Sequence, residues 1–227
     1  MKVIVACECS GVVRDAFIAR GHDAISCDLK PTEKPGPHYQ GDVCQFLNNN
    51  TTCDMLIAFP PCTYLCQTSS VAYKQNPIKR LPLMQEAVAF FTYLRQQPIT
   101  FIAIENPVPM ARTKLPKYTQ TIQPYYFGEP WMKKTCLWLK NLPPLQPTKP
   151  LSHIKFDPME LREVVNRPNL REDLRKHQHL LRRPHKASWH YSGGQLDPTR
   201  SARTFPGVAA AMAEQWGNLK QPYGFFS

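Results

Sequence analysis

The first half of the chain alternates between short apolar runs and longer segments whose apolar residues recur at helical spacing. Runs rich in valine, isoleucine and alanine predict buried strands over residues 2–7, 24–29, 55–59 and 100–104. Between the runs, apolar spacing predicts a helix after Ser10-Gly11 and another over residues 83–94. Alternating strands and helices indicate an α/β domain with a doubly wound, mostly parallel sheet and helices on both faces.

The second half of the chain has a different pattern. Residues 134–140 alternate apolar and polar positions, which is typical of an antiparallel strand, and a proline-rich stretch follows from residue 142. We therefore predict three regions: an α/β domain over residues 1–141, a small basic appendage over 142–192, and a closing segment over 193–227. The closing segment contains a predicted helix over residues 207–216, which returns to the α/β domain.

Polar and reactive residues follow the predicted parallel strands, at the points where the strands end. In sheets of this kind, ligands bind beyond the carboxyl ends of the strands, so these residues are expected to share one edge. The set contains acids, a glycine turn and a thiol, namely Glu8 to Gly11, Asp28, Asp42, Pro60 to Cys62, and Glu105-Asn106. The sequence therefore predicts a functional site at this edge.

Composition limits the class of protein. The chain has 227 residues, of which 42% are apolar, and contains no run of about 18 apolar residues, so no membrane crossing is expected. The first residues lack the features of a signal peptide, and we expect a cytoplasmic protein of bacterial or phage origin. Its eight cysteines are then expected to be free thiols. No cysteine or histidine pairs have the spacing of a zinc site, so no metal is predicted.

The net charge of +11 favours a polyanionic partner such as nucleic acid. Residues 174–190 hold five lysines or arginines, Arg182 and Arg183 among them, and no acid. We interpret this segment as a contact to the DNA backbone, against the alternative of a solvated helix face. No obligate protein partner is predicted.

The order of these elements resembles the cytosine-C5 DNA methyltransferase family, over about residues 3–140 and 193–217. Five local motifs carry the resemblance: Ala6 to Gly11, Ile25 to Pro31, Phe59 to Cys62, Ile104 to Pro107, and Gly128 to Thr135. Gly41-Asp42-Val43 and the last helix, Thr204 to Trp216, extend the match. The resemblance implies a Rossmann-like methyltransferase fold and the cofactor S-adenosylmethionine.

The resemblance also assigns roles to single residues. Asp28 would accept hydrogen bonds from the cofactor ribose, and Asp42 would accept one from the adenine amino group. The turn formed by Cys9, Ser10 and Gly11, together with Pro60, would complete the cofactor site. Cys9 stands where the family usually has a phenylalanine that packs on the adenine.

On the substrate side, the resemblance makes Cys62 the nucleophile and places Glu105 and Asn106 at N3 of the target pyrimidine. Lys133, Lys134 and Thr135 correspond to nucleic-acid contacts, with Thr135 replacing an arginine that contacts the base. A thiolate that adds to carbon 6 makes carbon 5 nucleophilic, and cysteine suits this step because it ionises readily and leaves readily. A cytosine within a duplex would have to flip out to reach such a site.

Other interpretations of the same residues stay open. Cys62 could be an ordinary buried thiol, and Asp28 and Asp42 could be caps of turns or helices. The threonine at position 135 allows an enzyme that modifies RNA or free nucleotides, or a donor group other than methyl. A non-catalytic DNA-binding protein that retains the fold is a further alternative.

Overall fold

The computed structural model describes residues 1–50, 52–129, 133–150, 191–192, 195–196 and 203–219. The described strands are β1 (Lys2–Ala6), β2 (Asp23–Asp28), β3 (His38–Gln40), β4 (Met55–Ala58), β5 (Phe101–Pro107), β6 (Gln120–Ile122), β7 (Thr135–Lys140), β8 (Tyr191–Ser192) and β9 (Gln195–Leu196). The described helices are α1 (Val12–Ile18), α2 (Val43–Asn49), α3 (Ser70–Gln75), α4 (Pro77–Arg95) and α9 (Pro206–Gly217).

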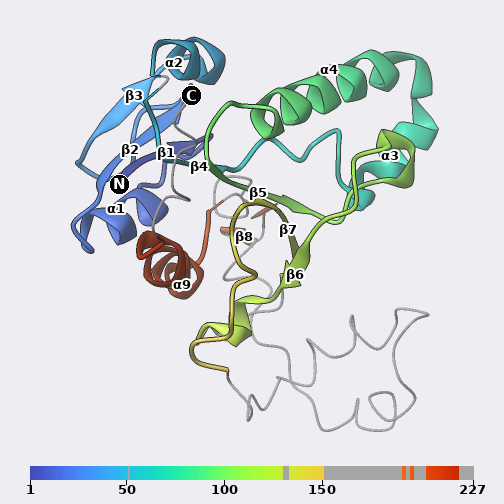
Figure 1. Cartoon of the computed structure of the whole chain (residues 1–227). Helices are drawn as coiled ribbons and strands as arrows, with labels where there is room; N and C mark the ends of the chain where they lie inside the picture. The colour runs from blue at the N-terminus through green and yellow to red at the C-terminus, as the bar shows by residue number, and fades with distance from the viewer. Residues whose placement is uncertain (51, 130–132, 151–190, 193–194, 197–202, 220–227) are drawn as a thin grey trace, which may run out of the picture.

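A seven-stranded sheet in the order β3-β2-β1-β4-β5-β7-β6 forms the centre of the molecule (Figure 1). The five strands from β3 to β5 pair in parallel, whereas β7 runs antiparallel to both of its neighbours. The predicted α/β class and mostly parallel sheet are therefore confirmed. Strand order reverses between β1 and β4, and such a reversal opens a crevice at the carboxyl edge of a sheet.

Apolar side chains on the two faces of the sheet form two cores. On one face, Val3, Val5 and Ile57 pack against α1 and α9, which lie side by side in Figure 1. On the other face, Leu56 and Ile104 pack against residues of α2 and α4. All four residues of β4 are buried, because a central parallel strand has helices over both faces.

The helix α9 is held at its first turn by residues from another part of the chain. The backbone N–H of Gly207 donates to Glu129 Oε1 at 2.9 Å, which places a carboxylate at the helix N-terminus. A side chain at position 207 would collide with the Phe127 carbonyl, so glycine is required for this close approach. The predicted return of the closing helix to the α/β domain is thus confirmed, with α1 as its neighbour.

A fully buried arginine, Arg14, fixes the loop between β2 and β3. Its guanidinium donates to the carbonyls of Lys34, Pro35 and Pro37 at 3.2–3.4 Å. It also donates to Ser26 Oγ on β2 at 3.3 Å. Buried arginine is tolerated where its donors are satisfied, and here the satisfied donors shape a loop that the sequence pattern left undefined.

Two details of the sequence prediction need correction. The short elements β3, β6 and α2 were not predicted, because segments of three to seven residues carry little periodic signal. The helix expected over residues 83–94 begins at Pro77 instead, where Pro occupies the first helical turn. Leu142 and Leu145, at the start of the expected appendage, pack in the core beside α9. The remainder of the expected basic appendage, residues 151–190, lies outside the described residues.

Within the described ranges, no helix has both the length and the apolar character needed to cross a bilayer. The same part of the chain contains no group of three or more histidine, cysteine or acidic residues that could hold a metal ion.

We expect Met212→Ala to lower the free energy of unfolding by about 2–5 kcal/mol, because it opens a cavity between α9 and the sheet. Urea denaturation would measure the change. Glu214→Ala on the exposed side of the same helix is the matched control, and its effect should stay within about 0.5 kcal/mol. Equal effects of the two substitutions would contradict the packing of α9 described above.

Candidate active site

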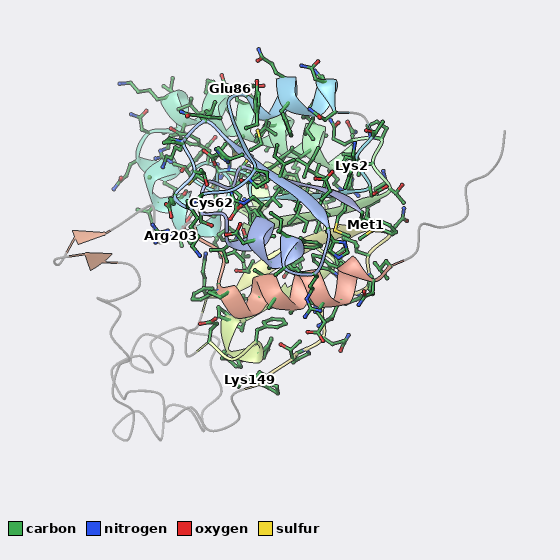
Figure 2. The ribbon with its side chains drawn as sticks, turned by 90° about the vertical axis from the view of Figure 1, so that its left-hand side faces the viewer. Met1, Lys2, Cys62, Glu86, Lys149 and Arg203 are labelled. Atoms are coloured by element: carbon green, nitrogen blue, oxygen red, sulfur yellow. The ribbon has the colours of Figure 1, made fainter. Side chains whose placement is uncertain are left out.

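Cys62 lies just beyond the end of β4, in a turn that is hydrogen-bonded within itself and to the segment after β5. Its carbonyl accepts from the N–H groups of Leu65 and Cys66 at 3.0 Å, and the Met110 N–H, after β5, donates to the Leu65 carbonyl at 2.8 Å. Figure 2 shows Cys62 toward one end of the sheet, whereas Met1 and Lys2, where β1 begins, lie toward the other. Cys62 is half-buried, so the predicted nucleophile is not enclosed by the core.

Asn106 joins the ends of β4 and β5. Its side-chain Nδ2 donates to the Pro60 carbonyl at 2.8 Å, and both residues are buried. A buried hydrogen bond of this kind is costly to break, because each partner would be left without water. The predicted catalytic residue Asn106 therefore has a clear structural action, which is to fix the Pro60-Pro61-Cys62 turn.

Glu105, the residue before Asn106, presents its carboxyl to a different set of groups. The Lys133 ammonium and the Thr135 hydroxyl on β7 both act to lower the pKa of this carboxyl, while the hydroxyl itself donates to the Lys133 carbonyl at 3.2 Å. Removal from solvent nevertheless raises the pKa of Glu105. Cys62 follows β4 and Glu105 lies near the end of the neighbouring strand β5, whose Ile104 pairs with Ala58, so the predicted pair shares one edge of the sheet.

A small hollow with a cavity volume of about 20 Å³, room for about one water molecule, lies beside Glu105. It is lined by β5, β7 and α9, with Lys133 and Thr135 on one side and Phe205, Val208 and Met212 on the other. The Lys133 Nζ lies 5.9 Å from the centre of the Phe205 ring. The predicted contacts Lys133 and Thr135 therefore adjoin the carboxyl within this hollow, whereas Lys134 is exposed.

A second thiol, Cys66, follows Cys62 by one turn of the chain, because the Cys66 N–H donates to the Cys62 carbonyl at 3.0 Å. The Cys66 Sγ lies 3.0 Å from Thr68 Oγ1 and 3.3 Å from Ser69 Oγ. The neighbouring Cys62 thiol and these hydroxyls lower the pKa of Cys66, whereas Cys66 and burial raise the pKa of Cys62. The sequence analysis assigned no role to Cys66, although its position four residues after Cys62 was a signal that a turn could bring the two residues together.

The turn before α1, which we expected to bind the cofactor, has a different hydrogen-bonding pattern from the predicted one. We expected the N–H groups after Ser10-Gly11 to face an external carboxylate. Instead, the Val13 N–H donates to Glu8 Oε1 at 3.4 Å and the Val12 N–H donates to Ser10 Oγ at 3.3 Å. The Ser10 hydroxyl donates to the same Glu8 oxygen at 2.5 Å. The N–H groups that we expected to face a ligand carboxylate are thus bonded to the side chains of Glu8 and Ser10.

Asp28 and Asp42 lie at the ends of β2 and β3, beside this turn. The Lys30 N–H donates to Asp28 Oδ1 at 2.9 Å, and the Gln45 N–H donates to Asp42 Oδ1 at 2.9 Å at the start of α2. Asp28 and Asp42 therefore each make the local bond expected of a residue that caps a turn or a helix, which was the alternative to a cofactor role. The two roles are compatible, because a carboxylate accepts several hydrogen bonds.

Two contacts enclose the region around Cys9. The Glu33 N–H, in the loop shaped by Arg14, donates to the Cys9 carbonyl at 2.8 Å. The Glu33 carboxyl forms an ion pair at 2.8 Å with Arg203, which precedes α9. Arg14, Glu33 and Arg203 escaped sequence analysis, because ion pairs between distant segments have no local pattern.

The structure brings most predicted site residues to the carboxyl edge of the sheet, from Cys9, Ser10 and Gly11 through Asp28, Asp42, Pro60, Cys62, Glu105 and Asn106 to Lys133 and Thr135. Arg182 and Arg183 lie outside the described residues. A scan against models of protein families found no match to the chain, and a search of curated proteins found none either.

We expect Glu105→Gln to stabilise the protein at about pH 8 and to have little effect at about pH 4. Because the folded state raises the pKa of Glu105, it holds a proton that the unfolded chain has already released, and stability falls as pH rises past about 4.3. Glutamine removes this cost because its side chain carries no titrating proton. Urea midpoints at the two pH values would measure the difference, and a loss of stability at the higher pH would contradict it.

Proposed function

We propose that this chain is a DNA methyltransferase that transfers a methyl group from S-adenosylmethionine to carbon 5 of cytosine through a covalent bond to Cys62. One observation carries the proposal: a half-buried thiol just beyond β4 and a carboxyl near the end of the neighbouring strand β5 share one edge of the sheet. The Asn106–Pro60 hydrogen bond holds the two strand ends together. Covalent catalysis on a pyrimidine needs this combination of nucleophile and acid.

The strand order supports the same proposal. Because β7 is antiparallel to both β5 and β6, strand β6 runs parallel to the first five strands. A mostly parallel sheet with one reversed strand near its edge agrees with the Rossmann-like methyltransferase fold that the sequence resemblance implies. The crevice between β1 and β4 then separates the proposed cofactor residues from the proposed substrate residues.

The protonation state of Glu105 suits its proposed role. Its raised pKa favours a protonated carboxyl, which can donate to N3 of the base as Cys62 Sγ bonds to carbon 6. Charge then accumulates on carbon 5, which takes the methyl group. After a base removes the carbon 5 proton, the bond between sulfur and carbon 6 breaks and the thiol is regenerated.

The residues present fit the nucleoside end of S-adenosylmethionine. Asp28 and Asp42 offer carboxylate oxygens to ribose hydroxyls and to an amine at neighbouring strand ends. The amino-acid end of the cofactor has fewer partners here, because the N–H groups at the start of α1 already donate to Glu8 and Ser10. When bound, the cofactor supplies an electrophilic methyl group; the protein's part is to orient it toward the hollow beside Glu105.

Basic side chains beside the Cys62 turn support DNA as the substrate. Arg80 on α4 stacks over the Tyr64 ring at 5.2 Å, and Arg112 stacks over Tyr73 at 4.1 Å. Tyr64 lies two residues after Cys62, so positive charge borders the proposed nucleophile. A flipped cytosine would enter between such phosphate contacts and the hollow.

We expect 5-methylcytosine in DNA from cells that express the wild-type chain and none in DNA from cells that express Cys62→Ala. Nucleoside mass spectrometry measures the product directly. The matched control is Cys53→Ala, which removes a thiol near the amino end of β4 and should retain methylation. Methylation by the Cys62→Ala protein would exclude the covalent route.

The same experiment separates the alternatives. Modified cytosine in RNA or in free nucleotides, but not in DNA, would reassign the substrate. A heavier cytosine adduct would identify a different donor group. DNA binding with no modified base in any pool would indicate a non-catalytic protein.

We expect Arg112→Gln to weaken DNA binding and to reduce the slope of log affinity against log salt by about one, because one phosphate contact is lost. Fluorescence anisotropy over a series of salt concentrations would measure the slope. Lys2→Gln is the control, because Lys2 lies toward the opposite end of the sheet from Cys62 (Figure 2) and should leave the slope unchanged. Identical slopes for wild type and Arg112→Gln would remove this residue from the interface.

A further inference from the structure

An ion pair joins the loop after β2 to the segment that precedes α9. The Arg203 Nη2 lies 2.8 Å from Glu33 Oε2, and the Glu33 backbone N–H donates to the Cys9 carbonyl at 2.8 Å. The pair therefore lies beside the turn after β1, which is part of the proposed cofactor site. A ligand can reach both side chains, because that of Arg203 is 39% exposed and that of Glu33 is 29% exposed.

The residues that follow Arg203 border the other half of the proposed site. Thr204 and Phe205 line the small hollow beside Glu105. One short segment thus adjoins both the turn at Cys9 and the carboxyl at Glu105. In the proposed reaction the cofactor has to lie between these two places, since its methyl group passes from the cofactor side to the substrate side.

The Arg203 guanidinium has the capacity to bind a further anion. Its Nη2 is bonded to Glu33, whereas its Nε has no hydrogen-bond partner among the residues that the structure describes. A guanidinium presents its N–H groups as a planar fork, so a second carboxylate can bind along another edge of the same group. Pairs of arginine and carboxylate are often bidentate, which also fixes the orientation of the ligand.

The other donors at this turn already have partners within the chain. The Val12 N–H donates to Ser10 Oγ, and the Val13 N–H donates to Glu8 Oε1. The Arg14 side chain is fully buried and donates to backbone carbonyls of the loop after β2. A ligand carboxylate beside this turn therefore needs a different cation.

We propose that Arg203 and Glu33 bind the amino-acid end of S-adenosylmethionine, with Arg203 holding the carboxylate and Glu33 holding the ammonium group. The inference rests on the proposed function, because it assigns contacts of the cofactor within that same site. An ion pair matches a zwitterion in charge, so each charge of the ligand meets an opposite charge and no net charge is added.

These contacts would make the site selective. A nucleoside without the amino-acid end leaves Arg203 and Glu33 bonded to each other and gains nothing from them. The complete cofactor gains two charge-assisted hydrogen bonds, which are stronger than neutral ones. The ion pair would thus favour the intact cofactor over its nucleoside fragments.

Isothermal titration calorimetry of the full chain with three nucleosides tests the assignment. S-Adenosylhomocysteine carries both charges, its decarboxylated amine carries the ammonium group alone, and 5′-methylthioadenosine carries neither. We expect Arg203→Gln to weaken the binding of S-adenosylhomocysteine by about tenfold or more, because a hydrogen bond between charged groups is lost. Its affinities for the other two nucleosides should stay within about twofold of the wild-type values.

We expect a different pattern from Glu33→Gln. It should weaken binding of both ligands that carry an ammonium group by about threefold or more, since glutamine accepts a hydrogen bond without the charge, and it should spare 5′-methylthioadenosine. Arg20→Gln is the matched control, because Arg20 forms an ion pair with Glu214 at 3.2 Å and is 40% exposed. This control should bind all three nucleosides as the wild type does.

Several results would overturn the assignment. Equal losses for all three nucleosides in Arg203→Gln would indicate that the ion pair is only structural. A loss of S-adenosylhomocysteine binding in Lys30→Gln, but not in Arg203→Gln, would move the carboxylate to Lys30, which follows β2. Unchanged affinities in Glu33→Gln would remove Glu33 from the ammonium group. Near-ultraviolet circular dichroism establishes that each variant retains its tertiary structure.

The wild-type protein separates this inference from the proposed function. If it binds 5′-methylthioadenosine as tightly as S-adenosylhomocysteine, the amino-acid end has no charged partners, and the inference fails while the nucleoside contacts remain. If it binds none of the three nucleosides, the proposed function fails and the inference fails with it.

Discussion

The hydrogen bond from Asn106 Nδ2 to the Pro60 carbonyl joins the ends of two neighbouring parallel strands, and the candidate site depends on it. Parallel strands bring their carboxyl ends to one edge, but the turns beyond that edge have no sheet partner to fix them. The buried amide supplies that partner for the Pro60-Pro61-Cys62 turn. It thereby sets the position of the thiol relative to Glu105, the residue that precedes the amide in β5.

The electrostatics of the site follow from burial at this edge. Desolvation favours the neutral forms of Glu105 and Cys62, while the Thr135 hydroxyl and the Lys133 ammonium favour the charged form of the acid.

Charged residues fix the segments beyond β1 and β2 by bonding to the chain itself. Glu8 caps α1 from within, and the Arg14 guanidinium shapes the loop after β2. Arg203 then links that loop to the start of α9 through Glu33. These contacts fix the turn after β1, the loop after β2 and the start of α9 relative to one another.

Sequence periodicity was sufficient for the elements that are long or wholly apolar. The strands β1, β2, β4 and β5 and the helix α9 could be predicted because burial on both faces, or on one helical face, leaves a regular apolar pattern. The short elements β3, β6 and α2 could not, since their formation depends on neighbours supplied by the fold.

The sequence by itself determined which reactive residues end the strands, because Cys62, Glu105 and Asn106 follow apolar runs that have to be buried. The tertiary structure alone decided how those residues are placed: that Asn106 Nδ2 bonds to the Pro60 carbonyl, and that Glu105 shares a small hollow with Lys133 and Thr135. The succession of strands and helices along the chain is local information, since it is written in consecutive residues. Hydrogen bonds between separate segments and the desolvation of an acid depend on the whole fold, so no local pattern encodes them.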